Sequence, residues 1–400
     1  MSEKKKKILY ISNVNLEGPF LPGVIYKIIG QELAFKKSGY EIDLLYPGNN
    51  NLITIKKDNG QKLLFKGARN TYTEGGIISK VFHHYQNSRF GTINFSECVD
   101  DIIKAQYDVI YLRFYLPGSN TISFIKKIKK ACPRIIILLE YPTSNIENLF
   151  KANIVSRVSH LMNRKKIKEL NQLADYLITL TRDKTLFGKP AIFMANGIDL
   201  DGITPISVPV FNNKIILLGV ASDCAFYHGF DKVIKGLALY TKEKKEVEFL
   251  FRIITSPLSR NVDELKNLSK ELGVEHLISF ELPRPRNELA EEYKLVHMGM
   301  GTLALHRVGL MDNYSLKHRE YAGFGLPFIM SKGDDDFEES PFVLTVERDE
   351  EPLDIQQVVD FFLSLKKKYP TYPQEFRKSV EGHITWDAQL KNVFAIINKA

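Results

Sequence analysis

Cysteine is scarce in this chain, with 3 residues among 400. Cys98, Cys132 and Cys224 lie too far apart for a disulfide framework, and no CxxC pair or Cys/His cluster predicts a metal site. Long apolar runs are also missing, since "ILYIS", behind the N-terminal lysines, is too short for a signal sequence or a spanning helix. These absences exclude disulfide-stabilised and membrane-spanning classes and predict a protein of the reducing cytoplasm.

Acidic residues are outnumbered, with 47 Asp and Glu against 55 Lys and Arg and a formal net charge of +8. Such an excess predicts an anionic partner: nucleic acid, a membrane surface or a phosphorylated substrate. The lysines are spread over both halves and no nucleic-acid-binding motif is present, so a phosphate-bearing substrate is favoured and nucleic acid is not expected. Peripheral contact with anionic lipid at the inner face of the membrane is the second interpretation.

Short apolar runs alternate with helical patterns in both halves of the chain. Runs such as "RIIILLE" and "KIILLGV" are apolar on both faces, which is typical of parallel sheets covered by helices on each side. The stretch "ANGIDLDGITPISVPVFNNK" is rich in turn formers and indicates a linker. We therefore predict an α/β protein with two Rossmann-like, doubly wound domains, and a binding site at the carboxyl ends of the strands.

The segment "DNYSLKHREYAGFGLPFIM" places two acids and a lysine around a predicted helix start. Asn313 or Ser315 can act as the N-cap, and a helix start offers unpaired N–H groups and partial positive charge to a phosphate. One or two turns further on, a carboxylate can accept hydrogen bonds from the hydroxyls of a ribose. The pattern indicates nucleotide recognition. The alternative is a capped amphipathic helix with a solvated pair of Lys317 and Glu320.

On these residues the chain resembles the GT-B glycosyltransferases, specifically the nucleotide-sugar-using family 4. That family has a Glu, seven residues, a second Glu and a Gly-Pro-hydrophobic exit. Here Asp312 and Glu320 take the acidic positions, and Gly325, Pro327 and Phe328 form the exit. The resemblance extends over nearly the full length and includes "PGVIYKIIGQELAFKKSGYEIDLLY", "ANGID" and "YHGFDKVIKGL".

The resemblance implies a metal-independent transferase that uses a UDP-linked sugar, needs no cofactor and retains the anomeric configuration. The acceptor would be a hydroxyl of a glycan, a lipid-linked oligosaccharide or a protein. Glu320 would hold the ribose hydroxyls, and Asp312 would face the donor sugar. Gly23, expected in the loop after the first strand, would let the backbone approach the diphosphate, and the alternative is a simple helix-entry glycine. Ser315 and Leu316, at the helix start, would lie beside the donor.

Two family cations are replaced in this chain. Where the family has "GRxxxxKG", the sequence has Gly219 and Val220, then His228. A departing nucleoside diphosphate accumulates negative charge and needs positive partners. Arg307, Lys317 and His228 are the predicted substitutes, each with a surface role as the alternative.

The sequence indicates fewer candidates for binding the acceptor than for binding the donor. Glu140 ends the strand "RIIILLE" and is expected at the edge of the cleft, where it either positions the acceptor hydroxyl or caps a neighbouring helix. "GDDDF" at 333–337 is expected to be a solvated loop and not a metal-binding DxD motif. Two other functions are compatible with the sequence: a non-catalytic GT-B subunit that supports a partner transferase, and a two-domain sugar-binding protein.

We predict an N-terminal acceptor-binding domain at 1–200 and a C-terminal donor-binding domain at 206–375. The last segment, 376–400, carries Trp386 and a helical apolar stripe. By the same resemblance it is expected to pack back on the N-terminal domain. A helix that stays on its own domain is the alternative.

Overall fold

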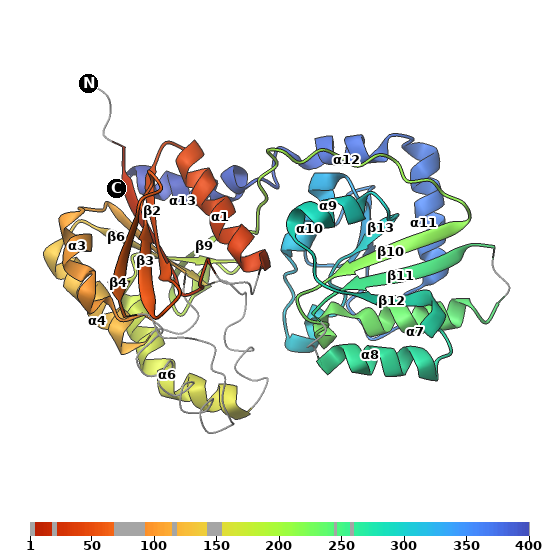
Figure 1. Ribbon diagram of the computed structural model, residues 1–400, viewed down its shortest axis with the longest axis horizontal. Helices are drawn as coiled ribbons and strands as arrows, with labels where there is room; N and C mark the ends of the chain where they lie inside the picture. The colour runs from red at the N-terminus through yellow and green to blue at the C-terminus, as the bar shows by residue number, and fades with distance from the viewer. Residues whose placement is uncertain are drawn as a thin grey trace. The chain divides into compact units, whose positions relative to one another are not determined.

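The structure is a computed structural model that describes residues 5–17, 22–67, 93–113, 118–141, 154–243, 246–256 and 260–399. The chain forms two compact units (Figure 1). Unit 1 comprises Met1–Ala195 with Gln389–Ala400, and unit 2 comprises Asn196–Ala388. The first division falls just before the "NGID" turn. The second falls inside the last helix, between Ala388 and Gln389, thirteen residues after the predicted boundary between 375 and 376.

Unit 1 is built on a mixed sheet of strand order β4-β3-β2-β1-β5-β6-β7-β9-β8. The strands from β2 to β9 in this order run parallel, while β3, β4 and β8 are antiparallel at the two edges. The elements are β1 (Lys7–Ser12), α1 (Pro22–Lys37), β2 (Glu41–Pro47), β3 (Leu52–Lys56), β4 (Lys62–Lys66), η1 (Phe95–Glu97), α3 (Val99–Lys104), β5 (Val109–Arg113), α4 (Ser119–Ala131), β6 (Ile136–Tyr141), α6 (Ile154–Leu173), β7 (Tyr176–Thr179), β8 (Thr185–Leu186) and β9 (Lys189–Phe193).

The central strands of unit 1 are buried on both faces because helices cover each side. All five residues of β5 are buried, as are the last five of β1 and of β6. Figure 1 shows α3, α4 and α6 on one side of the sheet and α1 on the other. The continuous apolar runs of the sequence therefore predicted these strands correctly.

Unit 2 has a parallel sheet of strand order β12-β11-β10-β13-β14-β15. The chain packs α9, α10 and α12 on one face and α7, α8 and α11 on the other (Figure 1). The elements are β10 (Lys214–Val220), η2 (Phe226–His228), α7 (Phe230–Tyr240), β11 (Glu248–Ile254), α8 (Arg260–Glu271), η3 (Glu275–Leu277), β12 (Ile278–Glu281), α9 (Arg286–Tyr293), β13 (Met298–Met300), η4 (Leu305–Val308), α10 (Leu316–Phe324), β14 (Phe328–Ser331), β15 (Val343–Val346), α11 (Ile355–Lys368), α12 (Tyr372–Val380) and α13 (Trp386–Lys399).

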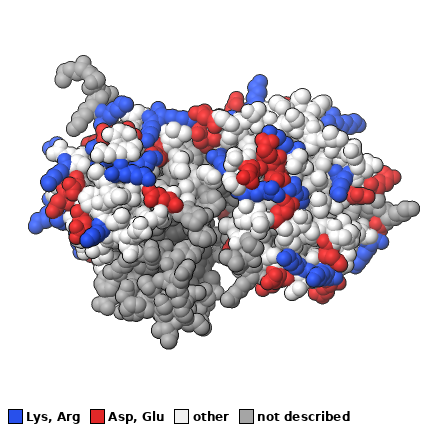
Figure 2. Space-filling model, viewed as in Figure 1, with Lys and Arg blue, Asp and Glu red and all other residues white. Residues whose placement is uncertain are grey.

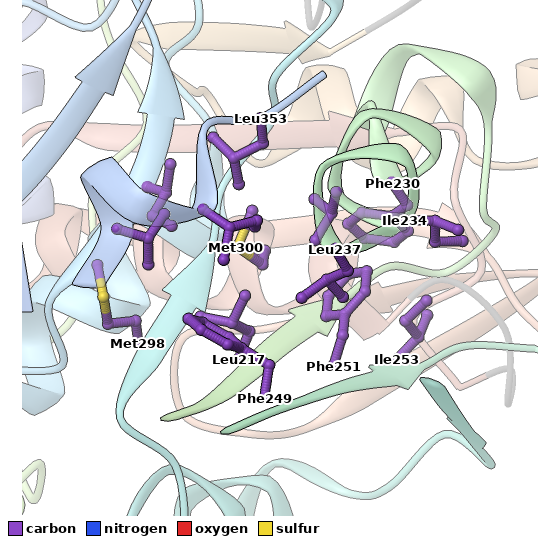
Figure 3. Packing of buried hydrophobic residues seen from close by; sticks show 14 of the residues in the cluster. Leu217, Phe230, Ile234, Leu237, Phe249, Phe251, Ile253, Met298, Met300 and Leu353 are labelled. Carbon is purple, nitrogen blue, oxygen red and sulfur yellow. The ribbon is translucent and has the colours of Figure 1, made fainter. Parts of the chain in front are cut away.

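The core of unit 2 positions the start of α7. Figure 3 shows Phe230 and Leu237 of α7 packed over Leu217 and Phe251 of the sheet. A Cβ at Gly219 would lie 2.8 Å from the Phe230 ring, so this position requires glycine. The close approach holds the first turn of α7, and with it η2, against the carboxyl end of β10. Both units contain a doubly wound α/β sheet in which most strands are parallel, and this confirms the predicted fold class.

The last helix belongs to both units. Trp386, at its start, lies against Gly197, where an added Cβ would be 2.8 Å from the Trp386 backbone and ring. Further along the helix, the ring of Phe394 lies 5.3 Å from that of Phe35 and 5.5 Å from that of Tyr40. The Tyr40 hydroxyl also donates to Asn398 Oδ1 at 2.7 Å. The residues of α13 after Ala388 thus complete the core of unit 1.

The described surface carries both signs of charge. Figure 2 shows lysine and arginine interspersed with aspartate and glutamate on this face of each unit. On the part of this face that the structure describes, the two signs of charge are therefore mixed. Among the described helices, none combines the length and apolarity of a bilayer-spanning segment.

Candidate functional site

Unit 2 contains a topological switch point between β10 and β13. From β10 the chain moves outward through β11 to β12, and from β13 it moves the other way through β14 to β15. The segments after these two strands meet, because Leu303 N donates to His228 O at 3.1 Å and Ala304 N donates to Tyr227 O at 3.1 Å. Open α/β sheets bind ligands at such a point. The start of α10 lies beside it.

The start of α10 resembles an anion site in its backbone. Ser315 is the N-cap in an extended conformation, with φ −72° and ψ 140°, and its side chain makes no capping hydrogen bond. The first N–H groups of the helix, from Leu316 onward, have no intrahelical acceptor. The helix ends at Gly325, whose φ of 70° and contact with Pro373 O require glycine. The predicted N-cap and glycine-terminated exit are confirmed.

Lys317 extends from this helix start to the switch point. Its Nζ lies 3.2 Å from Nδ1 of His228 and donates to Gly301 O at 3.2 Å. Burial lowers the pKa of Lys317 to about 7. Burial and the nearby Lys317 charge hold the pKa of His228 well below its usual value. Because an ammonium only donates, Nδ1 of the neutral His228 ring accepts and the ring proton lies on Nε2.

The ammonium group of Lys317 belongs to a half-buried side chain. Within the described ranges, no carboxylate lies within ion-pair distance of its Nζ. A buried charge without a partner is costly and is usually neutralised by a shifted pKa or by a ligand. An anion placed between Lys317 and the N–H groups of α10 would remove that cost.

The loop that carries Asp312 is fixed by its neighbours. Asn313 N donates to Gly333 O at 2.7 Å, and Asn313 Nδ2 donates to Thr302 O at 2.9 Å. Asn196 Nδ2 donates to Tyr314 O at 2.6 Å. These bonds tie both sides of Asp312 to buried groups and thereby set its position relative to α10. Asp312 itself is half-buried.

Glu320 lies on α10 one turn after Lys317. Its Oε1 is 3.4 Å from Nε of Arg286 on α9, and 21% of its side chain is exposed. Burial raises the pKa of Glu320, and the Arg286 charge opposes that rise. The carboxylate is therefore held by a cation on one side and accessible on another, as a hydrogen-bond acceptor for hydroxyls requires.

Arg307 is engaged elsewhere. Its guanidinium donates to Asp231 at 2.8 Å, to Glu350 at 2.6 Å and to Phe226 O at 2.7 Å. Two carboxylates compensate its charge, and the pKa of Arg307 is raised by these bonds. The structure therefore gives Arg307 the task of holding η2 to η4, and of the predicted cations only Lys317 remains uncompensated.

The acidic run after β14 is not a solvated loop throughout, which corrects the prediction for "GDDDF". Asp334 is 0% exposed and accepts from Arg319 Nη2 at 2.9 Å and lies 2.9 Å from His318 Nδ1. Arg319 also donates to Asn196 O at 2.8 Å and pairs with Asp336. Both basic residues point into the core because α10 turns this face inward. The run therefore anchors α10, and its Asp334 is buried.

Two predicted residues belong to unit 1 and are described within it. Glu140 ends β6 as predicted, but its side chain is 0% exposed and does not lie at an open edge. It pairs with Lys27 Nζ at 2.8 Å and accepts from the Tyr111 hydroxyl at 2.6 Å. Gly23 is exposed and lies in the first turn of α1, not in the loop before it.

Sequence reasoning missed three residues that position this site: Arg286, Arg319 and Asn196. Their partners Glu320, Asp334 and Tyr314 lie between 15 and 118 positions away in the sequence. No local pattern marks such pairs. The one local signal is the run of Lys317, His318 and Arg319 before Glu320, but it does not show that Arg319 turns inward to Asp334.

No protein-family model and no curated protein matches the chain. Solved structures match it over almost its whole length. A glycosyltransferase from Rickettsia africae is 13% identical, with a TM-score of 0.63 and coverage of 99% of each chain. Sucrose-phosphate synthase from Thermosynechococcus elongatus is 12% identical, with a TM-score of 0.65 and the same coverage. Anabaena HepE in complex with UDP and glucose is 12% identical, with a TM-score of 0.59, covering 99% of this chain and 100% of that one. The chain therefore has the GT-B fold that the sequence predicted.

Proposed function

We propose that this chain is a glycosyltransferase that moves a sugar from a UDP-linked donor to a hydroxyl of a glycan, lipid-linked or protein acceptor. The observation that carries the proposal is Lys317, a half-buried cation at the switch point of the unit 2 sheet that no carboxylate of the described residues compensates. The neighbour that binds UDP and glucose supports a UDP-linked donor. Another structural neighbour is bound to ADP and acarbose, so a test of the donor should include an adenine nucleotide as the control.

In the proposed site the diphosphate lies between Lys317, the Nε2–H of His228 and the first N–H groups of α10. Glu320 accepts from the ribose hydroxyls, and Asp312 faces the donor sugar. These groups meet the charge that develops on the leaving diphosphate, so the proposed reaction is metal-independent. The bond from the anomeric carbon to the phosphate oxygen breaks, and a bond to the acceptor oxygen forms on the same face. The acceptor proton passes to the leaving phosphate.

The test is release of UDP from a panel of UDP-sugars and ADP-glucose, with and without sugar acceptors, by the purified chain. We expect release from at least one UDP-sugar and a product of retained configuration by NMR. An inverted product would contradict the retaining mechanism, and absence of both binding and release would contradict the donor site.

Two observations favour a second candidate function. Arg307 is already paired with Asp231 and Glu350, and Val220 stands where the family has an arginine. The second candidate is a non-catalytic GT-B subunit that binds a donor or an acceptor and supports a partner transferase. If this function is correct, calorimetry on the chain alone should detect binding of a UDP-sugar, and no UDP should be released. The release experiment therefore separates the two functions.

Glu320→Ala should weaken UDP binding by about 2–4 kcal/mol, because two charge-assisted hydrogen bonds to the ribose are lost. Glu320→Gln should cost less, since the amide oxygen still accepts. Calorimetry with UDP measures both. Glu291→Ala is the matched control, because Glu291 lies on the surface of α9 in a pair with Lys294. Equal affinities for all four proteins would mean that Glu320 does not contact the nucleotide.

UDP binding should take up a proton at pH 8. Lys317 has a pKa of about 7 when free, so it is mostly neutral at pH 8, and a bound diphosphate favours its charged form. Affinity should therefore fall as the pH rises above about 7, by at most about tenfold per pH unit. At pH 6 Lys317 is already charged and uptake should be small.

Calorimetry in buffers of different ionisation enthalpy measures this proton. The ionisable groups around Lys317 are His228, Cys224 and, beyond the histidine, Asp223. Lys317→Arg separates them, because arginine stays charged at pH 8. Uptake should vanish in this variant. Undiminished uptake would assign the proton to His228.

A further inference from the structure

A pocket of about 270 Å³ in unit 1 is not used by the proposed transfer reaction. It lies between α6 and the hairpin of β8 and β9. Its walls include Arg164, Ile167, Lys168 and Asn171 of α6 with Phe187 and Lys189 of the hairpin. It combines an apolar floor with cations and one buried amide, a pattern common in small-molecule sites.

The side-chain amide of Asn171 is a buried polar group in the wall of this pocket. Asn171 is 2% exposed, and its Oδ1 accepts from the Tyr141 hydroxyl. Its Nδ2 has no hydrogen-bond partner among the described residues. A buried donor without an acceptor costs about 1–3 kcal/mol, which a ligand oxygen in the pocket would recover.

Two cations at the pocket are free to bind an anion. Arg164 and Lys168 are four residues apart on α6 and share a face of that helix. In the described ranges neither forms an ion pair. Lys189 differs from them, because its Nζ donates to Asn171 O at 2.7 Å and to Ala174 O at the end of α6. Arg164 and Lys168 therefore supply the positive charge.

The apolar wall is held in an unfavourable backbone conformation. Phe187 has a φ of 52° at the tip of the hairpin, followed by Gly188 with a φ of 76°. Glycine or asparagine is usual at the first of these positions, since a larger side chain costs about 1–2 kcal/mol there. The Phe187 ring is 38% exposed and lies 5.4 Å from the Tyr141 ring. A ring kept exposed despite this cost points to a ligand that covers it.

We propose that this pocket binds an anionic amphiphile, with its head group on Arg164, Lys168 and the Asn171 amide and its apolar part on Ile167 and Phe187. The site is independent of the donor site, because every residue that carries it belongs to unit 1. The head group is a phosphate or a carboxylate, whose oxygens accept from both cations and the amide. The amphiphile comes either from solution or from a bilayer.

Three probes separate these sources on the full-length chain: monomeric dihexanoyl phosphatidic acid, inorganic phosphate, and phosphatidylcholine vesicles with and without phosphatidylglycerol. We expect the short-chain lipid to bind at least tenfold more tightly than inorganic phosphate, because phosphate lacks the apolar part. Vesicle binding that needs phosphatidylglycerol and is lost in the variants below would identify a bilayer source. Short-chain lipid binding without vesicle binding would identify a soluble one.

The variant Arg164→Ala/Lys168→Ala should lower the affinity for the short-chain lipid at least tenfold. Its matched control is Lys130→Ala/Lys165→Ala, which removes the same charge from unit 1 at exposed positions outside the pocket. The control should stay within twofold of the wild-type affinity. Asn171→Asp keeps the acceptor for Tyr141 but replaces the donor by a carboxylate, and it should also lower the affinity at least tenfold.

The proposal is overturned if no probe binds, if Arg164→Ala/Lys168→Ala binds like wild type, or if the control double variant loses as much. Thermal unfolding of each variant identifies misfolded protein. If Asn171→Asp fails to fold, the two double variants, both at exposed positions, decide the question without it. Donor binding should be unchanged in all of them, so a failed transferase assay does not affect this test.

Discussion

Replacing Lys317 by methionine should lower turnover about 100-fold and weaken UDP binding by less than about tenfold. The leaving diphosphate carries more negative charge in the transition state than in the bound donor, so a cation aimed at it acts mainly on the rate. Methionine keeps an unbranched apolar stem beside the Phe230 ring, which lies 5.6 Å from Nζ. Rates of sugar transfer and UDP affinities by calorimetry measure the two effects separately.

The same variant should be more stable than the wild type at pH 6. Burial lowers the pKa of Lys317 from 10.5 to about 7, so the unfolded chain binds this proton more tightly. The resulting cost is complete below about pH 7 and declines as the pH rises toward 10.5. Lys317→Met removes it and should raise the free energy of unfolding by about 1–3 kcal/mol at pH 6, and by less at pH 10.

Denaturant unfolding at the two pH values checks this expectation. Lys270→Met on the surface of α8 is the control and should change stability by less than about 0.5 kcal/mol. A stabilised but slow Lys317→Met enzyme would mean that the lysine is kept for function at a cost in stability. A destabilised variant would instead mean that Lys317 is a structural residue, and the assignment of the donor site would lose its main support.

The fold was predictable because its signals are local. Runs such as "RIIILLE" are apolar throughout, which predicted strands of a parallel sheet, and the structure shows them buried on both faces. The alternation of such runs with amphipathic helices predicted the two doubly wound units. The start and end of α10 were predictable for the same reason, since an N-cap at Ser315 and a left-handed glycine at Gly325 are properties of a few neighbouring residues.

The electrostatics of the site were not predictable because the partners are distant in the sequence. Arg307 and Lys317 look alike as basic residues near the Asp312 segment. Folding brings Asp231 and Glu350 to Arg307, while Lys317 meets a neutral histidine and a carbonyl. Only the tertiary structure decides which of the two cations is paired with carboxylates and which has none among the described residues.

Glu140 shows the same limit in unit 1. Its position at the end of β6 was predicted, but its partners were not, because Lys27 is 113 residues away. Gln31 Nε2 donates to it at 3.2 Å, and Arg113 Nε lies 3.7 Å from it. Burial works to raise the pKa of Glu140, but the charges of Lys27 and Arg113 outweigh it and lower that pKa. Its role at the acceptor stays a prediction, and burial favours a structural role.

Glu140→Gln should destabilise unit 1 by about 3–5 kcal/mol. Glutamine keeps the shape and the bond from Tyr111, but it removes the negative charge that faces the buried cations Lys27 and Arg113. Adding Lys27→Met returns the cluster to its original net charge of one positive unit. The double variant should therefore recover at least about 1 kcal/mol of the loss. Chemical denaturation followed by circular dichroism measures both changes.

Turnover of the double variant, assayed where it is folded, decides between the two roles of Glu140. If the carboxylate binds the acceptor hydroxyl, restoring stability cannot restore transfer, and the double variant should be as slow as Glu140→Gln or slower. If Glu140 only joins α1 to β6, turnover should follow the folded fraction and approach the wild-type rate in the double variant. We expect the second result, because the Glu140 side chain is 0% exposed and is enclosed by Lys27, Gln31 and Tyr111, so an acceptor hydroxyl has no open path to it.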